Sequence, residues 1–321
     1  MLNLRILLIV LVLCCAAELA RATGDVRPET VRKETFIFAI EQNDTLRMDK
    51  YTLDQPAEAP QPVILFAFGG GFRGGNRAAA SYVSFFQELA RQGYIVVSTD
   101  YRTMLASLDQ SPASHPQAFI GLLQEAIATA TADFYRATRF IVEHSREWHA
   151  DPDKIVACGS SAGAITVLQA EYLQCQGHPA SRTLLPDGFH YAGVISFAGA
   201  IAATGPLEWK QTPCPLLLFH GDADRIVPYE KAEAEGIALW GSYSICQTLD
   251  QNNSPHVFYS VNRAGHEIAD LPMKQNLWEI RAFLSRLWEE TPLRFRHIRE
   301  QQDGTAAPVP CYTLHDYLEA Y

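Results

Sequence analysis

Several features that would assign this chain to a simple class are missing from its sequence. Basic residues do not dominate, because 26 Lys and Arg stand against 36 Asp and Glu and give a formal charge of −10. An acidic chain of this kind has no general attraction for nucleic acid or for anionic lipid. Glycine (20) and proline (18) are too few for a collagen-like or low-complexity chain, and no internal repeat or long linker is found in the 321 residues. With 48% hydrophobic and 19% charged residues, the chain is expected to form a folded core.

Long apolar runs are also absent, except at the N-terminus, where residues 1–22 read MLNLRILLIVLVLCCAAELARA. One arginine precedes the apolar residues, and Ala20-Arg21-Ala22 fits the small-x-small rule of a signal-peptide cleavage site. The run from Ile6 to Leu13 is too short for a membrane anchor. We therefore expect a cleaved signal peptide over residues 1–22. The mature chain would start at Thr23, have no membrane span, and be exported to the periplasm or secreted.

Cleavage at this site would leave five of the seven cysteines, so at least one thiol would stay free whatever bridges form. Cys158 lies in an apolar run and is expected to be a free thiol of the core. Cys311 lies in the C-terminal tail and is predicted to pair with Cys175, Cys214 or Cys246 if a disulfide forms. The sequence does not choose among the three.

Short apolar runs alternate with amphipathic stretches along most of the chain. Two segments of alternating polarity, Thr35–Ile40 and Leu46–Thr52, predict an antiparallel pair at a sheet edge. Six nearly continuous apolar runs are typical of strands buried on both faces: Val63–Phe68, Tyr94–Ser98, Ile155–Cys158, Ala192–Ser196, Leu216–Phe219 and Val257–Val261. Helices are predicted at Ala78–Arg91, Gln117–His144, Ala162–Gln174, Glu230–Trp240 and Lys274–Trp288. This order predicts an α/β fold with a mostly parallel, eight-stranded sheet and helices on both faces.

Ligands of such sheets bind at the carboxyl ends of the strands, so functional residues are expected just after the apolar runs. The run that ends at Cys158 is followed by Gly159-Ser160-Ser161-Ala162-Gly163, a Gly-x-Ser-x-Gly motif, and then by a predicted helix. Glycine on both sides permits the sharp strand-to-helix turn that exposes a nucleophile. Ser161 is therefore the candidate nucleophile, and the alternative is a glycine-lined turn without catalytic function.

Two further loops offer an acid and a base. Asp222 and Asp224 follow one apolar run, and we expect Asp224 to orient a histidine, with Asp222 as the second choice. His266 follows the last apolar run and is the candidate general base, whereas His220 is interpreted as structural. The chain order Ser161, Asp224, His266 is one of the orders known for a Ser-His-Asp triad.

A glycine run, Gly69-Gly70-Gly71, follows the apolar run Val63–Phe68. Such a run can cradle a phosphate or offer backbone N–H groups to an oxyanion. The Gly-Lys-Ser/Thr and Gly-x-Gly-x-x-Gly signatures of phosphate sites are missing, so we expect an oxyanion hole made of Gly70 or Gly71 and the N–H of Ala162. No set of His, Cys and Asp has metal-ligand spacing, and neither a metal nor another cofactor is predicted.

Together these motifs resemble the α/β-hydrolases of the esterase and lipase kind, in particular the carboxylesterase branch that carries a His-Gly-Gly-Gly motif. The resemblance covers residues 35–290 and includes Asp100-Tyr101-Arg102 and Asp151-Pro152-Asp153. It implies that the loops named above supply the oxyanion hole, nucleophile, acid and base. Phe68 stands where the family usually has the histidine that helps to shape the oxyanion loop. Asp100 and Arg102 are interpreted as a structural ion pair.

The sequence thus predicts an exported serine esterase that forms an acyl-enzyme and needs no cofactor. The 18 residues from Phe197 to Cys214 leave little room for a lid. A small cap or none is therefore expected, with short-chain acyl or acylated carbohydrate esters as substrates. A serine peptidase or lipase of the same fold, and a non-catalytic binding protein on this scaffold, are the alternatives. The expected divisions are the signal peptide, a catalytic domain at 23–290 and an extension at 291–321 that packs on the surface; the oligomeric state stays open.

Overall fold

The computed structural model describes residues 30–41, 43–54, 57–107, 116–234, 236–289 and 296–301. The predicted signal peptide and Cys311 lie outside these residues. A nine-stranded sheet forms the centre, in the spatial order β1-β2-β4-β3-β5-β6-β8-β11-β12. Its strands are β1 (Val31–Glu41), β2 (Asp44–Leu53), β3 (Gln61–Ala67), β4 (Ile95–Thr99), β5 (Ala150–Ser160), β6 (Gly193–Phe197), β8 (Leu216–Gly221), β11 (His256–Asn262) and β12 (Arg296–Gln301). The pairs β1-β2 and β2-β4 are antiparallel and the other pairs are parallel, which confirms the mostly parallel sheet.

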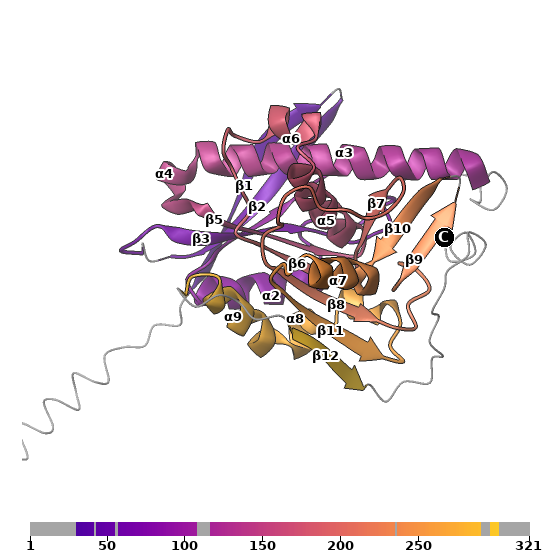
Figure 1. Cartoon of the computed structure of the whole chain (residues 1–321). Coiled ribbons are helices and arrows are strands. Elements are labelled where there is room, and N and C mark those ends of the chain that lie inside the picture. Colours follow the sequence, from indigo (N-terminus) through magenta and orange to yellow (C-terminus); the bar gives the residue numbers. More distant parts are fainter. Residues whose placement is uncertain are drawn as a thin grey trace, which may run out of the picture.

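Helices cover both faces of this sheet (Figure 1). One face carries α2 (Ala80–Arg91), α8 (Pro272–Gln275) and α9 (Leu277–Arg286), and the other carries α3 (Pro116–Glu143) and α5 (Ala162–Cys175). The remaining helices are α4 (Ser145–Trp148), α6 (Pro179–Leu184), α7 (Ser242–Gln251) and the 3-10 turn η2 (His266–Ala269). The predicted apolar stripe of α3 is buried, with Leu123, Ile127 and Phe134 each at most 6% exposed. This burial fixes the long helix on the sheet.

A second, antiparallel sheet was not expected from the sequence. It has three strands in the order β7 (Ala200–Ala203), β10 (Ile237–Gly241) and β9 (Lys231–Ala234). The helix predicted over Glu230–Trp240 is therefore wrong. The Ala, Glu and Lys residues of this segment favour a helix, but Gly236 turns the chain with φ 78°, and β10 pairs with both β7 and β9. This nonlocal pairing outweighs the local preference.

The ninth strand, β12, lies in the predicted C-terminal extension. The expectation of eight strands and of a tail packed on the surface is thus wrong for residues 296–301, which pair in parallel with β11. The His297 ring stacks on Phe258 with ring centroids 4.9 Å apart, and the partly buried Ile298 packs against the core. With a single core-facing aliphatic residue, the strand shows no apolar run from which it could be recognised.

The charged residues after β4 form two separate ion pairs, so the predicted pair between Asp100 and Arg102 is wrong. Asp100 accepts a hydrogen bond from Arg77 at 2.8 Å. Arg102 donates to both carboxylate oxygens of Asp133 on α3, at 2.9 and 2.8 Å. These contacts connect the loop after β4 with the loop before α2 and with α3, which gives the residues a structural role.

The four cysteines of the described residues are free thiols: Cys158, Cys175, Cys214 and Cys246. Cys158 is fully buried in β5, where burial raises the pKa of its thiol well above the ordinary value, and it is the core thiol expected from the sequence. The predicted pairing of Cys311 falls outside the described residues. Within the described ranges, no helix combines the length and the apolar character needed to cross a membrane.

Candidate active site

Ser161 lies at the sharp turn between β5 and α5, with φ 52° and ψ −119°, a conformation that L-residues rarely adopt. Its N–H donates to the Phe197 carbonyl at 2.9 Å, which ties the turn to the end of β6. A Cβ added at Gly159 would lie 2.3 Å from the Gly163 carbonyl oxygen. A Cβ added at Gly163 would lie 2.1 Å from the Ala67 carbonyl oxygen at the end of β3. The two glycines of the Gly-x-Ser-x-Gly motif are therefore steric requirements of this turn.

Ser161, His266 and Asp224 form a chain of hydrogen bonds at the carboxyl edge of the sheet. The Nε2 atom of His266 lies 2.8 Å from the Ser161 Oγ atom, and its Nδ1 atom lies 2.7 Å from the Asp224 Oδ2 atom. Since an ionised carboxylate only accepts hydrogen bonds, Nδ1 carries the hydrogen, and Nε2 is left to accept the Ser161 hydroxyl hydrogen. The contacts join residues 105 and 42 positions apart, so the parallel sheet brings them together.

The loop after β8 holds Asp224 as a carboxylate. Its side chain has no solvent exposure, and Oδ1 accepts the backbone N–H groups of Ile226 and Val227 at 2.8 and 3.0 Å. Burial acts to raise the pKa of Asp224, but hydrogen bonds from His220 and His266 outweigh it and hold the pKa well below its ordinary value. Asp224 therefore stays ionised and can orient His266 at neutral pH.

The other two candidates of this region take different positions. Asp222 Oδ1 accepts the backbone N–H of Arg263 at 2.6 Å. His220 is fully buried at the end of β8, with its Nε2 atom 3.3 Å from Asp224 Oδ2. The structure thus brings Asp224, and not Asp222, against His266, and it places a second histidine on the same carboxylate.

The loop after β3 turns on its glycines. Gly70 and Gly71 have φ of 138° and 61°, and a Cβ at Gly70 would lie 2.3 Å from the Gly74 carbonyl oxygen. The Gly70 carbonyl accepts the N–H groups of Arg73 and Gly74 at 3.0 and 3.1 Å. Among the described residues, the N–H groups of Gly70 and Gly71 have no partner within the protein. Ala162 is the first residue of α5, where N–H groups lack intrahelical acceptors and favour negative charge.

These loops surround a cavity of about 370 Å³. Its lining includes both proposed oxyanion glycines, the serine and the histidine, together with Gly69, Arg73, Tyr82, Ser160, Ile226, Ala269 and Asp270. No three His, Cys, Asp or Glu side chains are grouped as metal ligands in the part of the chain that the structure describes. The arrangement offers a nucleophile, a base with its acid, and unpaired backbone N–H groups in one cavity. This set can carry out acyl transfer.

The fold has many relatives among solved structures. Esterase 2 of Thermogutta terrifontis with bound propionate matches 83% of this chain and 97% of its own, with a TM-score of 0.59 and 19% identity. This chain has the α/β-hydrolase fold. The same Thermogutta enzyme phosphorylated by paraoxon matches 81% of this chain and 92% of its own, with a TM-score of 0.56 and 19% identity.

In sequence, the chain resembles curated esterases over part of its length, and no protein-family model matches it. Fumonisin B1 esterase of Sphingopyxis macrogoltabida is 28% identical over 121 residues, which are 38% of this chain and 22% of the relative. Esterase LipI of Mycobacterium tuberculosis is 33% identical over 125 residues, which are 39% of this chain and 33% of the relative. The chain therefore spans a third or less of the length of these relatives.

Aromatic rings support the glycine loop after β3, at the place where the family that the sequence resembles usually has a histidine. Phe68 is buried and stacks on Tyr101, with ring centroids 4.4 Å apart. The Tyr101 hydroxyl donates to the Phe68 carbonyl at 2.8 Å, and the Phe72 ring meets Tyr101 edge-on. Ring packing and the buried Tyr101 hydrogen bond thus help to hold the loop in place of the histidine.

One side chain near Ser161 was missed from the sequence. The Tyr82 hydroxyl lines the cavity and accepts the Gly69 N–H at 3.2 Å, but its position on a predicted amphipathic helix gave no functional signal. His220 was expected to be structural, and the turn of the chain after β8 brings its side chain against Asp224, four residues further on.

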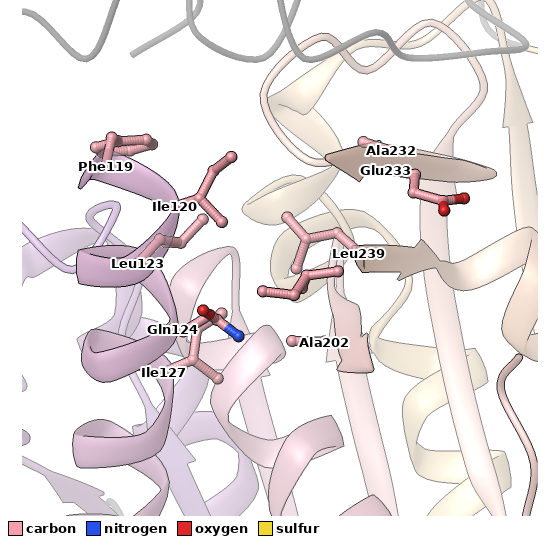
Figure 2. Close-up of a pocket in the computed structure, with 10 residues that line it drawn as sticks. Phe119, Ile120, Leu123, Gln124, Ile127, Ala202, Ala232, Glu233 and Leu239 are labelled. Carbon is pink, nitrogen blue, oxygen red and sulfur yellow. The ribbon is translucent and has the colours of Figure 1, made fainter. Parts of the chain in front are cut away.

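A second, smaller pocket lies apart from these residues. It measures about 50 Å³ and lies between the first turns of α3 and the three-stranded sheet (Figure 2). Phe119 and Leu123 approach it from the helix, and Ala202 and Leu239 from the strands. None of its lining residues lines the cavity around Ser161. The pocket and the cavity around Ser161 are therefore lined by separate sets of residues.

Proposed function

We propose that the chain is a serine esterase with Ser161 as nucleophile, His266 as general base and Asp224 as the acid that orients it. The observation that carries the proposal is the continuous chain of hydrogen bonds from Ser161 to Asp224, with contacts of 2.8 and 2.7 Å. The strained backbone of Ser161 at the strand-to-helix turn supports the same role. Esterases among the structural neighbours and the sequence relatives support the same reaction class.

The proposed reaction proceeds through an acyl-enzyme. His266 Nε2 takes the hydroxyl hydrogen of Ser161 as Oγ attacks the ester carbonyl carbon. The oxyanion of the tetrahedral intermediate accepts hydrogen bonds from Gly70 or Gly71 and from Ala162. Collapse of the intermediate breaks the bond to the alcohol oxygen, which leaves with the proton from His266. A water molecule then gives a proton to His266 and attacks the acyl carbon. The bond to Ser161 Oγ breaks, His266 returns the proton to Oγ, and the carboxylic acid leaves.

Replacement of the nucleophile tests this proposal. Ser161→Ala is expected to lower kcat toward p-nitrophenyl acetate by at least about 10⁴-fold and to abolish labelling by a fluorophosphonate probe. Ser254→Ala is the matched control, because Ser254 is a buried serine that does not line the cavity. Wild-type hydrolysis by Ser161→Ala would overturn the assignment, as would fluorophosphonate labelling at another serine.

For the substrates, we propose esters with short acyl groups, including acylated carbohydrates. Between β6 and β8 the chain contains the strand β7 and no helix, so no helical lid is inserted there. A cavity of about 370 Å³ that is not covered by such a lid suits small acyl groups and an alcohol attached to a larger chain. A series of p-nitrophenyl esters from acetate to laurate, together with acetylated xylan, tests this. Activity confined to the longest esters, with none on acetylated xylan, contradicts it.

The N-terminal segment supports a proposal of export. We infer that residues 1–22 direct the chain out of the cytoplasm and are removed before Thr23, because their charge, apolar run and small residues have the order of a signal peptide. N-terminal sequencing of the protein from the culture medium or periplasm should give Thr23 as the first residue. A product that retains Met1, or one confined to the cytoplasm, contradicts it.

A further inference from the structure

His220 approaches the same Asp224 oxygen as His266, and Ser242 contacts His220 in turn. The Nε2 atom of His220 lies 3.3 Å from Asp224 Oδ2 and 3.2 Å from the Val227 carbonyl oxygen. Its Nδ1 atom lies 2.8 Å from the Ser242 Oγ atom. The His220 side chain has no solvent exposure, so these contacts are its polar environment.

The hydrogen positions on His220 follow from its neighbours. Both atoms that face Nε2, the Asp224 carboxylate oxygen and the Val227 carbonyl oxygen, are acceptors, so Nε2 carries a hydrogen. In a neutral ring Nδ1 is then an acceptor, and the Ser242 hydroxyl donates to it at 2.8 Å in preference to the Gly199 carbonyl oxygen at 3.4 Å. Asp224 thus accepts two backbone N–H groups at Oδ1 and the Nδ1–H of His266 at Oδ2. The Nε2–H of His220, which also bonds the Val227 carbonyl, faces Oδ2 from 3.3 Å.

We propose that His220, held by Ser242, is a positioning residue that fixes the plane of the Asp224 carboxylate so that Oδ2 faces His266. Rotation of the carboxylate about the Cβ–Cγ bond moves both oxygens, so the two backbone donors at Oδ1 and the His220 N–H near Oδ2 oppose it together. His220 adds the restraint on the oxygen that His266 uses. This inference rests on the proposed esterase function, because it gives His220 a role only through Asp224 and His266.

The three-stranded sheet positions Ser242. Ser242 follows directly after β10, and a Cβ at Gly241 would lie 1.9 Å from the Pro228 carbonyl oxygen. Glycine at this position therefore allows the start of α7 to approach the acid loop closely. The ring of Tyr229 meets His220 edge-on, with ring centroids 5.7 Å apart. The titratable groups that face His220 and the carboxylate are thus Asp224 itself, Tyr229 and His266.

Substitution of His220 in the full chain tests the proposal through kcat and KM for p-nitrophenyl acetate. His220→Leu removes the donor and is expected to lower kcat about tenfold with KM unchanged, a split that a general loss of folding would not give. His220→Gln keeps an N–H near the Nε2 position and should restore most of kcat. Ser242→Ala should give a smaller loss in the same direction.

The matched control is His256→Leu. His256 is a buried histidine that also faces a carboxylate, with Asp250 at 3.5 Å. It lies at the amino end of β11, whereas the triad lies at the carboxyl edge of the sheet. Circular dichroism and thermal unfolding verify that each variant is folded. An unchanged kcat in His220→Leu overturns the proposal, and so do equal losses of kcat in His220→Leu, His220→Gln and His256→Leu. The Ser161→Ala variant tests the proposed esterase function independently of His220. A failure of that function is therefore distinguished from a failure of the role proposed for His220.

Discussion

Asp224→Asn is the most informative single change, because the structure fixes how the new carboxamide must sit. The N–H groups of Ile226 and Val227 point at Oδ1, so the carboxamide oxygen takes that position. Its NH₂ group then takes the place of Oδ2, 2.7 Å from His266 Nδ1. An NH₂ group only donates, so Nδ1 must accept and the imidazole hydrogen moves to Nε2. His266 would then donate to Ser161 and could no longer act as its base.

The expected loss follows from this exchange of donor and acceptor. A triad with the wrong histidine tautomer loses about 10⁴-fold in kcat, which is about 5.4 kcal/mol in the barrier. Steady-state hydrolysis of p-nitrophenyl acetate at pH 7 measures it, with KM expected to change little because Asp224 does not line the cavity. The rate of fluorophosphonate labelling at Ser161 should fall in parallel, since the same proton transfer activates the serine.

Asp222→Asn is the matched control on the same loop. Its carboxamide oxygen can still accept the Arg263 N–H, so kcat is expected to stay within about threefold of wild type. If Asp224→Asn lost less than tenfold, the tautomer argument would be refuted. If Asp222→Asn lost more than Asp224→Asn, the roles of the two carboxylates would have to be exchanged.

Two further predictions concern stability. Gly163→Ala brings a Cβ to 2.1 Å from the Ala67 carbonyl oxygen and is expected to cost at least about 3 kcal/mol of unfolding free energy and most of the activity. Gly121→Ala has no neighbouring atom within 4 Å on α3 and should instead stabilise the chain by about 0.5–1 kcal/mol, so equal urea midpoints would contradict the argument. Glu171 is buried, which raises its pKa, although its carboxylate accepts the Cys214 N–H at 2.8 Å. The native state then binds the Glu171 proton more tightly than the unfolded chain does. The unfolding free energy of the wild type should therefore fall as the pH rises above about 4.3, the ordinary pKa of glutamate. Urea unfolding of Glu171→Gln at pH 5 and pH 8 should show a smaller difference, and the same difference as in wild type would refute the reasoning.

The central sheet and the placement of its loops could be predicted because each signal is local. Parallel strands buried on both faces give short apolar runs, and their carboxyl ends meet at one edge, so the loops that begin at Gly69, Gly159 and Asp222 were expected to lie together. The same argument brought His266, after the last run, to this edge. That these side chains are catalytic stays a prediction until the variants are measured.

The features that the sequence did not reveal depend on contacts between distant segments. Lys231–Ala234 has helical propensity and becomes a strand because β10 pairs with both it and β7. Arg296–Gln301 lacks an apolar run and becomes a strand because β11 offers an unpaired edge. The contact between His220 and Ser242 depends on where α7 begins, which the mistaken helix over Glu230–Trp240 had hidden.

Gly163 packs closely against the end of β3, and this contact bears on which substitutions the site can accept. It places the turn that holds the serine against the strand that leads into the oxyanion loop, backbone against backbone. No side chain sets the spacing between these two elements at that point. Ile226 and Ala269, on the cavity wall, can therefore be exchanged to alter the range of substrates while the spacing is kept. Under the proposed function, the atoms that shape the substrate cavity are therefore different from those that set the spacing at Ser161.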